Sequence, residues 1–239
     1  MKMKKAISIL LLIACLLLSL TACGGDPTPS GNTPGTSDAP SASDAPSSEA
    51  PTEKVDPNAP ITEEMLRNHP VAPAEDFSYD VEDTGVTIRS YEGEDTIVVI
   101  PAEIEGKTVT NFKDYVFGSY STVRAVLVPD TVETIGEVFM NNSVLELVIC
   151  EGVTKLAGLT FGNCPALREV VVGENLQEIV GLGAFADCPK LETVHFTNSL
   201  TKIDSEYTFA GCDSLTIYGP AGSYAETFAK ENGVPFQVE

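Results

Sequence analysis

Residues 176–194 read LQEIVGLGAFADCPKLETV, and the same pattern of apolar positions returns several times in the C-terminal half of the chain. Phenylalanine is the clearest landmark, in steps of 22, 22, 24 and 24 residues at Phe117, Phe139, Phe161, Phe185 and Phe209. Short apolar runs follow in step, at residues 123–129, 144–150, 167–173 and 191–197, with a shortened copy from Leu215. A third register opens at Val132, Val153, Leu176 and Leu200, each followed three residues later by another large apolar residue. Registers that advance together over about 100 residues indicate a structural repeat.

A period of about 20–29 residues is typical of a leucine-rich repeat, in which each coil holds a short strand and a return segment. The unit that runs from Leu176 through Phe185 and Cys188 to Val194 resembles the BspA-like, Treponema-type class of these repeats. The resemblance covers about residues 95–218 and implies an α/β-type, mostly β repeat solenoid with a parallel concave sheet. Because one coil has too little apolar surface to fold alone, we expect stacked coils to share one continuous core.

Both ends of a solenoid must be covered. The alternation of residues 77–90 around Asp83-Thr84-Gly85 predicts a β-hairpin cap within a lead-in of residues 61–94. At the other end, residues 219–239 are expected to form a cap with a helix over 223–230, in which Ser223 caps and Glu226 follows three residues on, and a final strand near 235–238. One helical turn is also expected over residues 62–67.

The first 22 residues have the features of a secretory signal peptide. Three lysines precede an apolar stretch of residues 6–22, and no basic cluster follows that would indicate a membrane-spanning helix. The sequence Leu20-Thr21-Ala22-Cys23 resembles a bacterial lipobox, which implies that Cys23 carries a lipid. We therefore expect a protein held at the bacterial cell membrane or surface through its lipid anchor, outside the cytoplasm. Two or more acyl chains give stable attachment where one gives only marginal binding.

The next segment, residues 24–60, is rich in Pro, Ser, Thr and Asp and carries Val55 as its only large apolar residue. Such a composition cannot offset the entropy cost of ordering, so with Cys23 it is predicted to be a disordered tether. Without the lysines in front of Cys23, 11 basic residues face 35 acidic ones, which is a net charge of −24. This charge argues against nucleic acid as a partner.

Six cysteines in an exported chain would ordinarily suggest disulfides. However, Cys164, Cys188 and Cys212 recur at a spacing of 24 residues, which places them at equivalent points of successive coils. Stacked side chains point in the same direction, so free thiols are favoured, although the distance between coils does not exclude a bridge. Tyr120 and Asn142 stand where cysteine recurs later, which predicts less regular corners in the early coils.

The motifs of catalysis are missing from the sequence. The only histidines are His69 and His195, and there is no metal-ligand pair, CxxC, phosphate loop or nucleophile elbow. The sequence therefore predicts no enzymatic activity, no cofactor and no metal site. His195 could point from the sheet toward a ligand or could simply be one polar residue on an exposed strand.

The concave sheet is the candidate binding face. Alternation within the strands predicts that Val126, Leu147, Val170 and Val194 point inward and that the intervening residues point outward. The predicted face comprises one apolar column and one polar column, made of Val99, Leu127, Val148, Val171 and His195, and of Glu146, Glu169 and Thr193. An exposed apolar stripe often marks an interaction site. Two alternatives stay open: β-branched residues there simply stabilise strands, or the N-terminal segment or the tether folds over the stripe.

These features favour a surface module that binds a protein or cell-envelope ligand, and the BspA-like resemblance implies a role in recognition or adhesion. The first alternative is a scaffold that docks other envelope proteins. An exported enzyme is a more distant alternative, because the chemical groups for catalysis are missing.

Overall fold

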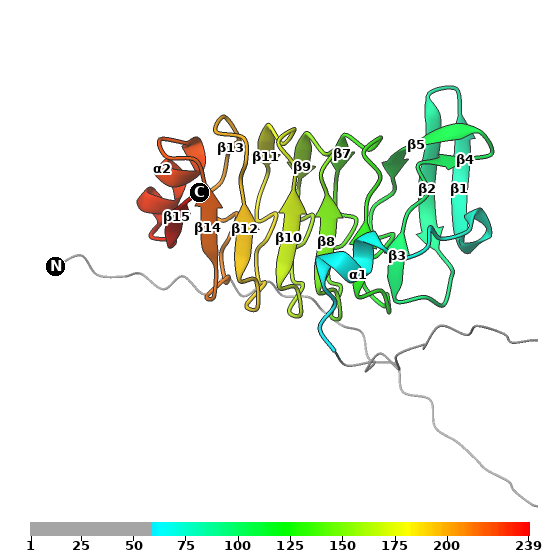
Figure 1. Cartoon of the computed structure of the whole chain (residues 1–239), viewed down its shortest axis with the longest axis horizontal. Helices are drawn as coiled ribbons and strands as arrows, with labels where there is room; N and C mark the ends of the chain where they lie inside the picture. Colours follow the sequence, from blue (N-terminus) through cyan, green and yellow to red (C-terminus); the bar gives the residue numbers. More distant parts are fainter. Residues whose placement is uncertain (1–58) are drawn as a thin grey trace, which may run out of the picture. The chain divides into compact units, whose positions relative to one another are not determined.

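The computed structural model describes residues 59–239, and its main feature is a seven-stranded parallel sheet with one strand from each successive coil (Figure 1). In order along the sheet the strands are β3 (Ile97–Val99), β6 (Ala125–Leu127), β8 (Leu147–Cys150), β10 (Glu169–Val172), β12 (Thr193–His195), β14 (Thr216–Gly219) and β15 (Phe236–Val238). Each strand pairs with the next in parallel, so the predicted mostly-β solenoid is confirmed. The predicted signal peptide, Cys23 and most of the tether lie outside the described residues.

A second parallel sheet follows the return segments of the coils. Its short strands are β7 (Thr134–Ile135), β9 (Lys155–Ala157), β11 (Glu178–Val180) and β13 (Lys202–Ile203). Their central apolar residues, Ile135, Leu156, Ile179 and Ile203, are buried in the same core as the inward side chains of the first sheet. The core therefore runs between the two sheets from coil to coil, as nearest-neighbour stacking requires.

The repeated phenylalanines form a continuous stack. Ring centroids are 5.7, 5.2, 5.0 and 5.0 Å apart from Phe117 to Phe209, and each pair is close to parallel. Four of the five rings are fully buried, and Phe209 at the last coil is 7% exposed. Tyr91 closes one end of the stack in a tilted contact, and Phe228 closes the other end edge-on. The alignment expected from the 22- and 24-residue spacing is therefore confirmed.

One coil was placed out of register in the sequence-based prediction. The residue equivalent to Val123 is Leu145, which is fully buried, whereas Val144 is exposed. As a result Val148 and Cys150 point into the core, whereas Leu147 and Ile149 lie on the opposite face. Leu145 lies six residues after Phe139. The other repeated phenylalanines are followed at the same offset by the buried apolar residue that precedes the strand, such as Val123 after Phe117. The Phe register therefore gives the correct alignment, and the local apolar run does not.

The corners between return segment and strand are held by side-chain donors to backbone carbonyls. The thiols of Cys164, Cys188 and Cys212 donate to the carbonyl oxygen of the phenylalanine in the preceding coil, at 3.0–3.2 Å. Asn142 does the same at 2.9 Å, and its Oδ1 also accepts from two backbone N–H groups of the following turn. The expectation of a less regular corner at Asn142 is wrong, because the amide replaces the thiol with more hydrogen bonds. Tyr120 is fully exposed at the first corner.

The return segment of the last full coil also departs from the expected pattern. Leu200 is 76% exposed, and the neighbouring Thr201 is buried in its place. Its hydroxyl donates 2.7 Å to the carbonyl oxygen of Leu176 in the preceding coil. A buried hydroxyl is tolerated because this hydrogen bond is made.

The predicted caps are present at both ends of the solenoid. A short 3₁₀ turn, η1 (Ala74–Asp76), leads into the hairpin of β1 (Phe77–Glu82) and β2 (Gly85–Tyr91). The hairpin forms a separate sheet with β4 (Glu103–Ile104) and β5 (Lys107–Phe112). At the C-terminus, helix α2 (Tyr224–Asn232) starts at Ser223, whose side chain accepts from the Glu226 N–H. The helix ends at Gly233, which has the positive φ of 71° that glycine adopts readily. Across residues 59–239, no helix is long and apolar enough to span a membrane.

Candidate binding surface on the concave sheet

Two columns of side chains form the outer face of the large sheet. The strand register aligns one column at Ile97, Ala125, Leu147, Glu169, Thr193 and Thr216, and the other at Val99, Leu127, Ile149, Val171, His195 and Tyr218. The face is therefore apolar along β3, β6 and β8, which we term the covered half. It is largely polar and aromatic along β10, β12 and β14, which we term the open half.

Most of the predicted face residues lie on this surface. Val99, Leu127, Val171 and His195 belong to one column, and Glu169 and Thr193 belong to the other. Val148 is the exception: it is fully buried in the interior core, because of the one-residue shift described above. Glu146 precedes β8 and lies at the rim of the face, where it takes part in ion pairs.

The N-terminal segment Ala59–Arg67, which we call the strap, covers the apolar half of the face. It contains the short helix α1 (Glu63–Arg67), which confirms the helical turn expected over residues 62–67, and the Thr62 side chain caps its first turn. Helix α1 contacts β3 and β6 and is drawn across the face of the sheet in Figure 1. Of the alternatives left open, this arrangement supports folding of the N-terminal segment over the stripe.

Two apolar side chains anchor the strap. Ile61 is 2% exposed and Leu66 is fully buried, and they pack with Val99, Leu147 and Ile149 in a cluster that is separate from the interior core. Burial of an aliphatic side chain of this size contributes roughly 1.5–3 kcal/mol. Ile61 and Leu66 are therefore the buried apolar side chains through which the strap docks.

The sheet also binds the backbone of the strap. Arg124 donates to the carbonyl oxygen of Ala59 at 2.9 Å, and Arg168 donates to that of Ile61 at 3.1 Å. Between these guanidinium groups, Glu146 pairs with both arginines at 2.6 and 3.5 Å and accepts from the Ile61 N–H at 3.4 Å. The three charged side chains are largely shielded from solvent, so their hydrogen bonds are stronger than those of an exposed surface pair.

Arg67 fixes the far end of the strap. Its Nη1 and Nη2 atoms each lie 2.9 Å from an oxygen of Glu151, and Nη2 also contacts Glu63 at 3.2 Å. Hydrogen bonding to the Arg67 guanidinium lowers the pKa of the Glu151 carboxyl below its ordinary value. A cleft of about 410 Å³ lies beside this pair, and its walls include Val71, Leu127 and Ile149.

The open half carries a small aromatic and acidic group. The rings of His195 and Tyr218 stack with centroids 4.7 Å apart, and both Glu239 carboxylate oxygens lie 3.0 Å from His195 Nδ1. The strap reaches the edge of this half at β10, where Val171 borders the strap cluster and Glu169 lies beside Glu63. Burial and the Glu63 carboxylate raise the pKa of Glu169. This group leaves the polar atoms of His195 and Tyr218 and the negative charge of Glu239 at the surface. Such a surface suits a polar or cationic contact with a partner.

The buried cysteines serve the structure of the solenoid. Burial raises the pKa of Cys150 to about 12, and hydrogen bonding with Cys164 raises that of Cys188 to about 12. Thiols of this kind stay protonated and act as donors at neutral pH, and the four cysteines of the described solenoid are unbridged. Within residues 59–239 no group of three or more His, Cys, Asp or Glu side chains could hold a metal ion.

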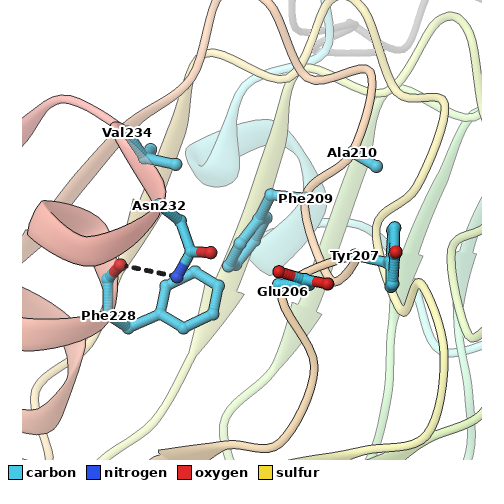
Figure 2. Close-up of a pocket in the computed structure, with 7 residues that line it drawn as sticks. All are labelled: Glu206, Tyr207, Phe209, Ala210, Phe228, Asn232 and Val234. Atoms are coloured by element: carbon cyan, nitrogen blue, oxygen red, sulfur yellow. Dashed lines mark hydrogen bonds between the residues drawn. The ribbon is translucent and has the colours of Figure 1, made fainter. Parts of the chain in front are cut away.

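A second hollow lies at the C-terminal cap. Figure 2 shows Phe209 and Phe228 at the base of this cleft of about 330 Å³, with Glu206 and Tyr207 on the side of the last coil. Asn232 on α2 donates 2.9 Å to the Phe228 carbonyl oxygen, so its amide stabilises the end of the helix. The cleft is the place where the phenylalanine stack ends.

Parallel strands, return segments and a continuous phenylalanine stack define a leucine-rich-repeat solenoid. Six copies of the BspA type leucine rich repeat region match residues 96–216, just over half of the 239-residue chain. The chain therefore belongs to the BspA-type leucine-rich-repeat family. No curated protein matches its sequence.

Several solved structures match this chain. The leucine-rich repeat protein of T. pallidum is 25% identical, with a TM-score of 0.57 over 62% of this chain and 71% of that chain. A leucine-rich repeat protein from Bacteroides capillosus is 22% identical, with a TM-score of 0.41 over 63% and 98% of the two chains. A leucine rich cell surface protein from Faecalibacterium prausnitzii is 19% identical, with a TM-score of 0.38 over 64% and 55%. The T. pallidum match supports the repeat fold of this chain.

Several residues of the face were missed by the sequence interpretation. The anchors Ile61 and Leu66, and the rim residues Arg124, Glu151 and Arg168, were not singled out. A signal was available, because Ile61 and Leu66 are apolar residues just before and within a capped helical turn in a mostly polar segment. Nothing local to the sequence indicates where such a turn docks.

Proposed function

We propose that the protein is an exported lipoprotein that presents its solenoid as a binding module for a protein or cell-envelope ligand. The observation that carries this proposal is the open half of the concave sheet. There Thr193, His195 and Tyr218 are only half-buried on a rigid parallel sheet, with Glu169 and Glu239 beside them. Rigid side chains lose little entropy on binding, which favours recognition by such a surface.

The cellular setting of the proposal is extracytoplasmic. The lysine-rich start, the apolar stretch and the lipobox-like Leu20-Thr21-Ala22-Cys23 support export and lipid attachment at Cys23. The segment between Cys23 and the strap would then space the solenoid from the membrane, as its Pro- and Ser-rich composition suggests. Recognition or adhesion at the cell surface is the role that these features fit best.

Binding by the open half is tested with a pair of matched variants in intact cells. Thr193→Arg places a large side chain on the open half, and Gln177→Arg places the same side chain on an exposed return segment. After chemical cross-linking, we expect wild-type protein and Gln177→Arg to capture the same partner and Thr193→Arg to capture about tenfold less. Equal capture by both variants would show that the open half is not the binding surface.

Anchoring is tested independently at Cys23. Mass spectrometry of the native N-terminus should find a lipid on a Cys23 that has become the first residue. Cys23→Ser should release the protein from the membrane fraction, while Cys15→Ser should leave it there. An unmodified Cys23 in the native protein would contradict this part of the proposal.

A further inference from the structure

The strap is bound to the solenoid in the manner of a ligand. Its anchors Ile61 and Leu66 belong to an apolar cluster on the outer face of the sheet, separate from the interior core that holds the coils together. The sheet beneath is completed by its own strand pairing from β3 to β15. The coils therefore keep their interior contacts whether or not the strap is seated.

The contacts also define a recognition pattern. The face, which we call the strap groove, offers an apolar floor of Val99, Leu127, Leu147 and Ile149. Two arginines at its rim donate to the backbone carbonyl oxygens of Ala59 and Ile61, and the Glu146 carboxylate accepts from the Ile61 N–H. At its far end Glu151 accepts two hydrogen bonds from one guanidinium. Such a groove fits a short segment with two apolar side chains five residues apart and a basic residue directly after the second.

The strap itself is weakly organised. Helix α1 has only five residues, and a helix of that length has little stability without tertiary contacts. Segments held by few side chains open locally at a lower free energy than the global unfolding transition. The strap thus combines a specific seat with a low intrinsic tendency to hold its shape.

We propose that the strap groove is a peptide-binding site beside the open half, that the strap is its resident occupant, and that a partner protein with an amphipathic segment of the same chemistry displaces it. This inference rests on the proposed function, since it assigns a protein partner to the same concave sheet. It adds that the partner must compete with the strap for the covered half. A tethered occupant acts at an effective concentration of about millimolar, so the strap would suppress weak partners and admit strong ones.

The test uses the full chain and a labelled synthetic peptide that carries residues 58–70. In the double variant Ile61→Asp/Leu66→Asp the chain's own strap loses both anchors. We expect saturable binding of the peptide to this variant by fluorescence anisotropy, and at least about tenfold weaker binding to the wild-type chain. Adding Glu151→Ala to the double variant should weaken peptide binding about tenfold, because the bidentate partner of Arg67 is lost. The matched control Glu178→Ala, on a return strand, should leave the affinity unchanged.

A second measurement keeps the inference testable if the double variant does not fold. In hydrogen exchange of the wild-type chain, strap amides should exchange at least about a hundredfold faster than those of β8 and β10, through local opening. Strap amides that exchange only with global unfolding would overturn the inference, and so would a folded double variant that binds no peptide. Either result leaves partner capture by the open half unaffected, so the two proposals fail separately.

Discussion

The two halves of the concave sheet have the same backbone and different surroundings. Along β3, β6 and β8 the outward side chains are Val, Ala, Leu and Ile, and the strap covers them. Along β10, β12 and β14 they include Glu169, Thr193, His195 and Tyr218, and no described helix is drawn across β12 and β14 in Figure 1. The comparison teaches that the solenoid fixes the strand positions, while the outward residues decide which part of the face is exposed.

The largest effect on stability is expected in the phenylalanine stack, because this part of the interior core lies beneath both halves of the face. Phe161 is fully buried in the middle of the phenylalanine stack. Phe161→Ala should lower the free energy of unfolding by about 3–5 kcal/mol, because a cavity opens beneath both halves. Urea denaturation followed by circular dichroism measures the loss. An effect confined to one half, seen as hydrogen-exchange changes on only one side of β8, would contradict a continuous core.

Leu66→Ala should separate the halves. The change removes a fully buried anchor and should weaken docking of the strap by roughly 1.5–3 kcal/mol. Faster hydrogen exchange is expected in the strap and on β3 and β6, with β12 and β14 unchanged. Met65→Ala is the matched control, because Met65 only borders the same cluster. Similar acceleration in both variants would argue against Leu66 as a specific anchor.

Adding one methyl group at Gly173 should strain the contact between the coils of β8 and β10, where the two halves meet. Gly173 follows β10, and a Cβ at this position would collide with the backbone carbonyl of Glu151 in the coil of β8. Gly173→Ala should therefore cost about 1–3 kcal/mol as the two coils are forced apart. Gly136→Ala serves as control, since its Cβ would meet only the Asp114 side chain. Thermal unfolding distinguishes the two, and equal melting temperatures would disprove the close approach.

A smaller loss is expected on the open half. Tyr218→Ala removes the ring stacked on His195 but leaves the interior untouched, so stability should fall by only about 0.5–1.5 kcal/mol. Chemical denaturation measures this change, and Tyr224→Ala on the exposed side of α2 is a suitable control. A loss as large as that of Phe161→Ala would mean that the open half belongs to the core.

The smallest effect is a difference in titration. The Arg67 guanidinium lowers the pKa of Glu151, so the stabilisation of the docked strap is present above the ordinary carboxyl pKa and is lost as pH falls through the lowered value. Burial and the Glu63 carboxylate raise the pKa of Glu169. Its charged form therefore costs stability above the raised pKa, and this cost disappears as pH falls through that value. Carbon-13 NMR of the two carboxyl groups should show titration of Glu151 below Glu169. The gap between the two should narrow in Arg67→Gln because the pKa of Glu151 rises, and an unchanged Glu151 would contradict the bidentate pair.

The coil-to-coil alignment could be predicted from Phe117, Phe139, Phe161, Phe185 and Phe209, because a buried aromatic ring tolerates only an equivalent position in each coil. The strand of residues 144–150 was misplaced by one residue, since the four consecutive apolar residues 147–150 contain no polar residue to mark the outward side. The shift moved Val148 onto the predicted face and Leu147 off it. The caps were predicted correctly because their signals are local: residues 77–90 alternate around a turn, and Ser223 caps a helix within one turn.

The chain's own amino-acid order determined the repeat, its period, the caps and the residues able to face outward, because these depend on spacing along the backbone. Whether an outward residue meets solvent or another segment was decided only in three dimensions. Ile61 reaches Ile149 and Arg168 across about 90–110 positions of the chain, and no local pattern encodes such a contact. The apolar stripe thus marked a genuine docking surface, and the fold placed the strap on it.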